Sequence, residues 1–206
     1  MANGASSAFF ICLLTMKPEV ATLLCLGGIG YLFWIDRGRG EGFSAAVWIP
    51  FFWMLFAGSR FASQWWNLGR PESISIEAYG EGSPFDRVVF LVLISAGLLV
   101  LFQRRLDLAG LVSQNPWLFL FFLFATASLV WSDDPSLSFK RLVKGVGNLI
   151  MALVLLTERR PYEALGAVLR RLAYVLVPLS VLFIRYYPEL GRSYHMGIPM
   201  YTGVAF

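Results

Sequence analysis

The chain has 206 residues, of which 57% are hydrophobic and 15% are charged, and its formal net charge is +4. Soluble domains carry about 45–50% apolar and about 25% charged residues, so this composition argues against an ordinary soluble domain. It also excludes intrinsic disorder, which needs low hydrophobicity and high charge. Six membrane helices of about 20 residues would take about 120 residues. We therefore expect an all-α, polytopic transmembrane helical bundle of about six spans, forming one domain over residues 1–206.

Six apolar blocks along the chain support this expectation. They are Val20–Ile35, Phe43–Gly58, Val88–Phe102, Pro116–Trp131, Leu142–Leu156 and Leu172–Ile184. Each apolar core is slightly short for a span, and flanking aromatic and basic residues can complete it at the interface. A seventh stretch, Ala8–Met16, is too short to cross and is cut off by Lys17-Pro18-Glu19. We expect it to form a short N-terminal half-helix.

Basic residues between the blocks predict the orientation in the membrane. Connectors 36–42, 103–115 and 158–171 hold eight Lys and Arg residues in 34 positions, whereas the other connectors and the tail hold eight in 64. Because cytoplasmic loops are enriched in these residues, we expect the denser set to be cytoplasmic. Loops 59–87 and 132–144 and the tail from Arg185 would then face outside.

The segment WSDDPS at 131–136 is typical of a helix start. Asp134 can cap free N–H groups while Pro135 takes the first helical position, and Ser136 follows in the first turn. Lys140, Arg141 and Lys144 then fall in the first three turns of the helix.

These three cations oppose the helix macrodipole by roughly 0.3–1 kcal/mol each. Free N–H groups and cations together suit a phosphate, which would explain a basic cluster at this place. The alternative is that they are ordinary interfacial charges, partly paired with the two aspartates before the helix.

Two further places contain candidate site residues. Arg60 ends an apolar block and is followed by Trp65 and Trp66, which are either interfacial anchors or a platform for sugar rings. In the tail, Arg192 lies among tyrosines and close to His195, the one histidine of the chain.

Several kinds of site are not expected. One histidine and two cysteines inside apolar stretches cannot build a zinc site. Glycine patterns for nucleotides and basic runs interleaved with aromatic residues are missing from the sequence, so we expect no nucleotide cofactor and no nucleic-acid partner. No catalytic residue is assigned.

Five segments, in this order, carry a resemblance to a known family. They are Ala46–Arg60, Glu81–Arg87, Ser128–Arg141, Val177–His195 and Gly197–Val204, with WSDDPS and the YPELGR…YTGV tail as the most specific pieces. With them the chain resembles the N-terminal half of the O-antigen ligase and exopolysaccharide polymerase family of bacterial envelope proteins.

The resemblance implies a multi-pass protein of the bacterial inner membrane that transfers a glycan from a polyprenyl diphosphate to a sugar hydroxyl outside that membrane. Its partners would be the lipid-linked glycan and membrane lipids, and it would need no cofactor and no metal. The family pattern implies a diphosphate site at Arg60, Lys140, Arg141 and Arg192, beside the helix cap at Asp134 and Ser136. It implies glycan contacts at Trp65, Trp66 and Tyr201.

The family pattern continues past the TGV-type ending with His, Lys and Asn residues and further spans, whereas this sequence ends at Phe206. We therefore expect a separate C-terminal half, without which the chain is inactive, and we do not assign His195 as a catalytic base. Two other hypotheses are a transporter or flippase for an anionic lipid-linked glycan and a non-catalytic membrane scaffold. Transport is disfavoured because the apolar blocks carry few charges and show no inverted repeat.

Reporter fusions at Gly80 and Gly110 test the predicted orientation. We expect an alkaline phosphatase fusion to be active at Gly80 and inactive at Gly110. The density of basic residues places loop 59–87 outside and connector 103–115 in the cytoplasm. A green fluorescent protein fused at the same positions is the control and should give the opposite pattern. Finding Gly80 in the cytoplasm would overturn the external anion site.

Overall fold

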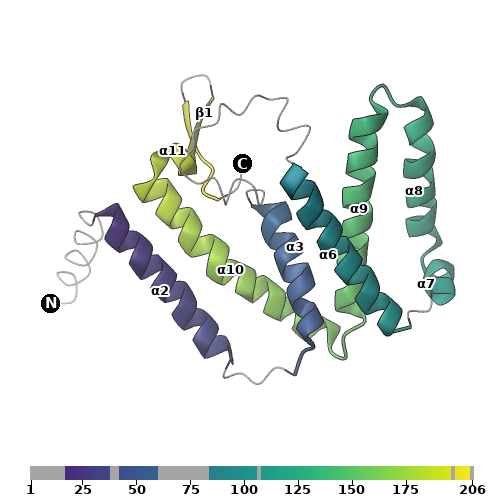
Figure 1. The fold of residues 1–206 in the computed structure, drawn as a ribbon, viewed down its shortest axis with the longest axis horizontal. Coiled ribbons are helices and arrows are strands. Elements are labelled where there is room, and N and C mark those ends of the chain that lie inside the picture. Colours follow the sequence, from purple (N-terminus) through teal and green to yellow (C-terminus); the bar gives the residue numbers. More distant parts are fainter. Residues whose placement is uncertain (1–16, 38–41, 60–83, 106–107, 196–197, 205–206) are drawn as a thin grey trace. The chain divides into compact units, whose positions relative to one another are not determined.

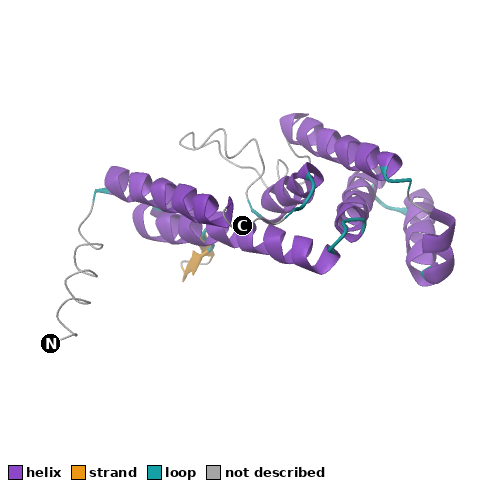
Figure 2. Ribbon diagram, turned by 90° about the horizontal axis from the view of Figure 1, so that it is seen from below, coloured by secondary structure: helices purple, strands orange, loops and turns teal. Residues whose placement is uncertain are grey.

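The structure is a computed structural model that describes residues 17–37, 42–59, 84–105, 108–195 and 198–204. These residues are mostly helical, and their sheet is a single two-stranded hairpin (Figures 1 and 2). The predicted all-α class therefore holds apart from this hairpin. The predicted half-helix Ala8–Met16 and the residues Arg60, Trp65 and Trp66 lie outside the described residues.

Proline begins most of the helices. The helices are α2 (Pro18–Arg37), α3 (Trp48–Gly58), α6 (Pro84–Gln103), α7 (Leu108–Gln114), α8 (Pro116–Ala127), α9 (Pro135–Leu156), α10 (Pro161–Tyr186) and α11 (Pro188–Gly191). Short 3-10 turns precede α3 (Ala45–Val47) and follow α8 (Ser128–Trp131), and the hairpin strands are β1 (Arg192–His195) and β2 (Ile198–Tyr201). Proline suits the first helical position because it lacks the N–H that would be unsatisfied there and its φ is already helical.

Among the described residues, three helices, α2, α6 and α10, are long and apolar enough to cross a membrane. The expectation of about six spans is therefore not supported, although each of the six apolar blocks does contain a helix. The helical stretches Ala45–Gly58 and Pro116–Trp131 have fewer than the roughly 20 residues that a span needs. Helix α9 is 22 residues long, but three cations in its first half make it amphipathic.

Helix α10 begins at Pro161, eleven residues before the predicted apolar block that starts at Leu172. Glu163 favours this start because an acidic residue in the first turn complements the helix dipole. Arg170 and Arg171, expected in a cytoplasmic connector, instead lie inside the helix and pair with Asp36. A buried carboxylate that pairs with both side chains makes this placement possible.

The contacts divide the described chain into two compact units. Unit 1 contains α2, α11, the hairpin and α10 from Leu169 onward. Unit 2 contains most of α3, all of α6 to α9 and the first residues of α10.

In unit 1, α2 runs antiparallel to α10. At one end the hydroxyls of Thr22 and Tyr187 lie 3.0 Å apart. At the other end Asp36 accepts hydrogen bonds from Nε of Arg170 at 3.0 Å and from Nε of Arg171 at 2.9 Å. The Asp36 side chain is only 2% exposed, so this carboxylate depends on its two partners.

In unit 2, α6 and α9 run parallel and pack closely because a glycine on α6 faces α9. A Cβ at Gly97 would lie 2.7 Å from Cγ2 of Ile150 and 3.3 Å from Cε of Met151. Earlier along the same two helices, Nζ of Lys144 on α9 lies 5.8 Å from the centre of the Phe90 ring on α6. In both contacts the α9 residue lies 53 or 54 positions after its α6 partner, so the two helices run in the same direction.

Trp53 of α3 joins α3 to both of these helices. Its side chain is buried, its ring packs edge-on against Phe90 of α6 at 5.0 Å, and its Nε1 donates to Oδ1 of Asn148 on α9 at 2.7 Å. A Cβ at Gly147 would lie 2.2 Å from Cη2 of Trp53, so the indole fills the space over this glycine. Trp53 and Gly147 therefore fix how α3 approaches α9.

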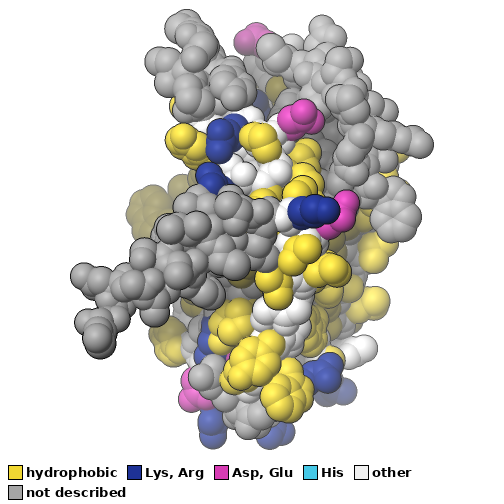
Figure 3. Space-filling view, turned by 90° about the vertical axis from the view of Figure 1, so that its left-hand side faces the viewer, with side chains coloured by type: hydrophobic (Ala, Val, Ile, Leu, Met, Phe, Trp, Pro, Cys, Tyr) yellow, Lys and Arg dark blue, Asp and Glu magenta, His cyan; other side chains and the backbone are white. Residues whose placement is uncertain are grey.

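Large apolar side chains are exposed on several helices. Helix α8 has no buried residue in the described structure, and Trp117, Phe121 and Phe124 are 80%, 62% and 64% exposed. Figure 3 shows further exposed apolar side chains, in yellow, on one face of the molecule. A helix that is apolar all round and not covered by protein is expected in lipid, which supports membrane association.

Replacing Gly147 with alanine tests the contact with Trp53. We expect the thermal unfolding midpoint in detergent to fall, by the equivalent of about 1–3 kcal/mol, because the new methyl group displaces a buried indole. Gly166→Ala is the matched control, since a Cβ on that helical glycine meets nothing within 4 Å. Equal unfolding midpoints for the two variants would contradict the packing described here.

Candidate functional site

The start of α9 is built as the sequence predicts. Oδ1 of Asp134 accepts a hydrogen bond from the backbone N–H of Leu137 at 3.1 Å, and Pro135 is the first helical residue. The predicted cap at Asp134 is thus confirmed. Ser136 is exposed in the first turn and makes no hydrogen bond to a described residue, so it does not share the capping role.

A second contact at this helix start was not foreseen. The hydroxyls of Ser132 and Ser138 lie 2.6 Å apart and close the turn that leads into α9. Both residues belong to the segment that carries the family resemblance. The turn and the cap together hold the first residues of α9 in place.

Two cations follow this cap. Lys140 is half-buried and Arg141 is exposed. Neither forms an ion pair or hydrogen bond with any residue that the structure describes, and the predicted partial pairing with Asp133 and Asp134 is not found there. These two side chains therefore have no counter-ion in the described part of unit 2 and are available to an external anion.

The tail residues Arg192 and Tyr201 come together in unit 1. They lie opposite each other in the antiparallel hairpin of β1 and β2, and Cζ of Arg192 lies 5.3 Å from the centre of the Tyr201 ring. Nε of Arg192 donates to the carbonyl of Ile184 at 3.1 Å. The terminal guanidinium nitrogens make no hydrogen bond to a described residue, so the stacked and anchored side chain still presents donors outward.

Two glycines hold this hairpin against α10. A Cβ at Gly191 would lie 2.3 Å from the backbone carbon of Phe183. Gly203 has φ of +63°, which favours glycine, and its Cβ would lie 2.9 Å from Cβ of Ser180. The N–H groups of Thr202 and Gly203 both donate to the carbonyl of Gly191 at 3.1 Å. These contacts explain the glycines of the LGR and YTGV pieces in physical terms.

The predicted site residues thus fall into three groups. Asp134, Ser136, Lys140 and Arg141 lie together at the start of α9 in unit 2, and Arg192 and Tyr201 lie together in unit 1. Arg60, Trp65 and Trp66 are outside the described residues.

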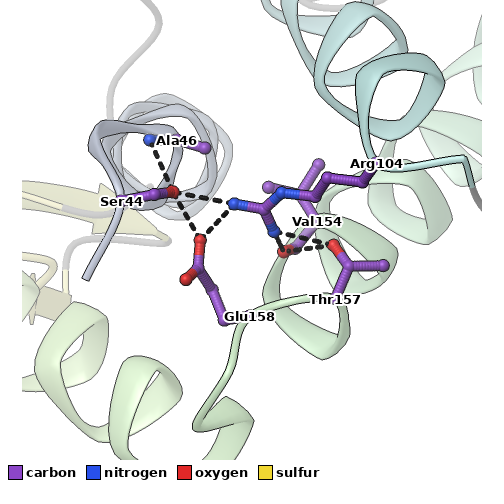
Figure 4. A network of polar contacts seen from close by, with 6 residues as sticks. All are labelled: Ser44, Ala46, Arg104, Val154, Thr157 and Glu158. Atoms are coloured by element: carbon purple, nitrogen blue, oxygen red, sulfur yellow. Dashed lines mark hydrogen bonds and ion pairs between the residues drawn. The ribbon is translucent and has the colours of Figure 1, made fainter. Parts of the chain in front are cut away.

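A third polar cluster, in unit 2, is not predicted by any pattern in the sequence (Figure 4). Nη2 of Arg104 pairs with Glu158 and donates to Oγ of Ser44 at 2.7 Å. Nη1 donates to Oγ1 of Thr157 at 2.8 Å and to the carbonyl of Val154 at 3.1 Å. Arg104 lies fifty or more positions from each of these partners in the sequence, so no local pattern could predict the cluster.

This cluster controls the ionisation of Glu158, whose side chain is only 6% exposed. Burial by itself would raise the pKa of Glu158, but the hydrogen bond from Ser44 and the hydrogen bond and charge of Arg104 outweigh it and hold the pKa below its ordinary value. The cluster joins the chain entering α3 to the C-terminal ends of α6 and α9. Ser44 lies just past connector 36–42, and the ends of α6 and α9 lead into connectors 103–115 and 158–171. All three connectors are predicted to be cytoplasmic.

Comparison of the chain with protein-family models, curated proteins and solved structures finds no match. The resemblance to the O-antigen ligase family therefore stays a prediction.

Glu158→Gln tests the buried pair. Because the folded-state pKa is lowered, ionised Glu158 stabilises the fold above the ordinary pKa of 4.5, and this contribution is lost as the pH falls through the lower folded-state value. We expect the variant to lose about 1–3 kcal/mol at pH 7 and to show a smaller loss of stability than wild type below about pH 4.5. Thermal unfolding across pH measures both effects.

The matched control is Glu163→Gln, because the Arg160–Glu163 pair is exposed and contributes little. If the pH dependence of Glu158→Gln equals that of wild type, the ionised pair does not stabilise the fold.

Proposed function

We propose that the chain takes part in bacterial surface polysaccharide assembly as a lipid-linked glycan ligase or polymerase, or as the N-terminal part of one. It would transfer a glycan from a polyprenyl diphosphate to a sugar hydroxyl outside the inner membrane. The bond between the anomeric carbon and the diphosphate breaks, and a bond to the acceptor oxygen forms. The acceptor proton leaves, and the diphosphate departs with the bonding electrons and a growing negative charge.

One observation carries the proposal. Lys140 and Arg141 follow a capped helix start in an apolar protein and have no counter-ion among the described residues. Cations near a helix N-terminus are costly unless an anion accompanies them. A departing diphosphate is an anion that such a site would stabilise more strongly in the transition state than in the ground state.

Arg192 is the second part of the proposal. Its planar guanidinium is held by the Ile184 carbonyl and by the ring of Tyr201, which is 64% exposed. Preorganised donors stabilise charge without having to reorganise during the reaction. In this proposal Arg192 binds a phosphate oxygen, and Tyr201 is a glycan contact.

The membrane arrangement belongs to the same proposal. Helices α2, α6 and α10 would cross the inner membrane, and the shorter apolar helices α3 and α8 and the amphipathic α9 would complete the six-block arrangement. The exposed apolar surface of α8 supports contact with lipid. In this proposal the catalytic base is assigned to no described residue.

Deletion and complementation test the function. We expect a strain lacking the full reading frame to lose or shorten its surface polysaccharide, and the Lys140→Gln/Arg141→Gln and Arg192→Ala variants to restore at least tenfold less polymer than wild type. Polysaccharide length on gels, with protein level measured by immunoblot, gives the result.

The matched controls are Arg159→Gln, at an exposed arginine beyond the other end of α9, and Arg185→Ala, at an exposed arginine in the last turn of α10. Both should restore normal polymer. Full activity of the Lys140→Gln/Arg141→Gln variant would reject the anion role of those two residues, and full activity of Arg192→Ala would reject that of Arg192. Normal polysaccharide in the deletion strain would reject the function.

A further inference from the structure

We propose that a pocket between α7, α8 and α9 binds the acyl chain of an anionic phospholipid, with the lipid phosphate beside Arg141. The pocket has a volume of about 220 Å³, and its apolar lining includes Leu111, Leu118, Phe119, Phe122, Val146 and Leu149. This volume exceeds that of the engineered apolar cavity of about 150 Å³ that binds benzene. It is large enough for several methylene groups of a hydrocarbon chain.

The two polar residues of the lining make hydrogen bonds to the backbone of the chain itself. Nδ2 of Asn115 donates to the carbonyl of Leu111 at 3.3 Å, and Oγ1 of Thr126 donates to the carbonyl of Phe122 at 2.8 Å. Each of the two residues thus makes one hydrogen bond within its own part of the chain. The other residues of the lining are apolar, so a polar ligand would be desolvated there with little compensation.

The pocket is open to the surroundings of α8. Leu118, Phe119 and Val146 are 40%, 54% and 37% exposed although they line it. The exposed apolar side chains of Phe121 and Phe124 continue the same helix. In a membrane this surface faces acyl chains, so a chain can enter sideways without first crossing water.

Charge complementarity selects the headgroup. A Cβ at Gly145 would lie 3.7 Å from Cε1 of Phe122, which sets the level of α8 against α9. Because the two helices are antiparallel, Thr126, one turn after Phe122, lies at the level of Arg141, one turn before Gly145 (Figure 1). The Thr126 end of the pocket is therefore level with an exposed cation that has no ion pair in the described structure.

The arrangement fits an anionic phospholipid, since basic residues near the membrane surface attract anionic headgroups. The inference rests on the proposed function in one respect only, which is that Arg141 binds an anion. It requires no glycan and no second half of the protein.

Native mass spectrometry of the full chain, released from bilayers with equal amounts of phosphatidylglycerol and phosphatidylcholine, tests the site. Wild type should retain phosphatidylglycerol about fivefold over phosphatidylcholine. Val146→Trp, which fills the pocket, should lose both lipids. Arg141→Gln should keep lipid but lose the preference. Val130→Trp is the matched control, because Val130 is 87% exposed and outside the pocket lining, and it should behave as wild type.

Retention of lipid by Val146→Trp at the wild-type level would overturn the proposal, as would equal loss in Val130→Trp. Preferential capture of polyprenyl phosphate, added as a competitor, would reject the phospholipid as occupant. If Val146→Trp does not fold, photolabelling of the wild-type protein tests the pocket instead. A phosphatidylglycerol with a photoreactive acyl chain should label Phe119 and Val146 more than Phe121. A strain with normal polysaccharide after deletion would reject the proposed function and leave these lipid measurements unaffected.

Discussion

The close approach of α3, α6 and α9 at two glycines is the constraint on which unit 2 depends. Gly97 admits the side chains of Ile150 and Met151, and Gly147 admits the indole of Trp53. Within a membrane the hydrophobic effect between helices is absent, so tight packing and satisfied polar groups must supply the association. The hydrogen bond from Trp53 to Asn148 and the cluster around Arg104 supply the polar part.

This packing separates unit 2 into two chemically different ends. At the C-terminal end of α9, Glu158 and Arg104 neutralise each other and are enclosed by Ser44 and Thr157. Toward the N-terminal end, roughly 24 Å from the last residue of α9 at 1.5 Å per residue, Lys140 carries a charge that nothing described compensates. One end is therefore suited to hold helices together, and the other is suited to meet a ligand.

Local signals in the sequence predicted local structure well. Asp134-Pro135 predicted the start of α9 to the residue, because a cap and a first-position proline are both decided within one turn. The structure supports three of the about six expected spans among the described residues. Apolar content alone does not show where a helix ends, and Asn115-Pro116 and the turn after Ala127 limit α8. The pairing of Arg104 with Glu158 could not be predicted, since only the tertiary fold brings these positions together.

The carboxylate of Asp36 pairs with two arginines at consecutive positions of α10. Loss of the aspartate would leave two adjacent cations that repel each other, whereas loss of one arginine would leave a balanced pair. The three positions should therefore change in a fixed order during evolution. A neutral residue can appear at 170 or 171 while Asp36 stays, but position 36 can become neutral only after its partners have changed. Covariation among these positions would then be directional rather than symmetric.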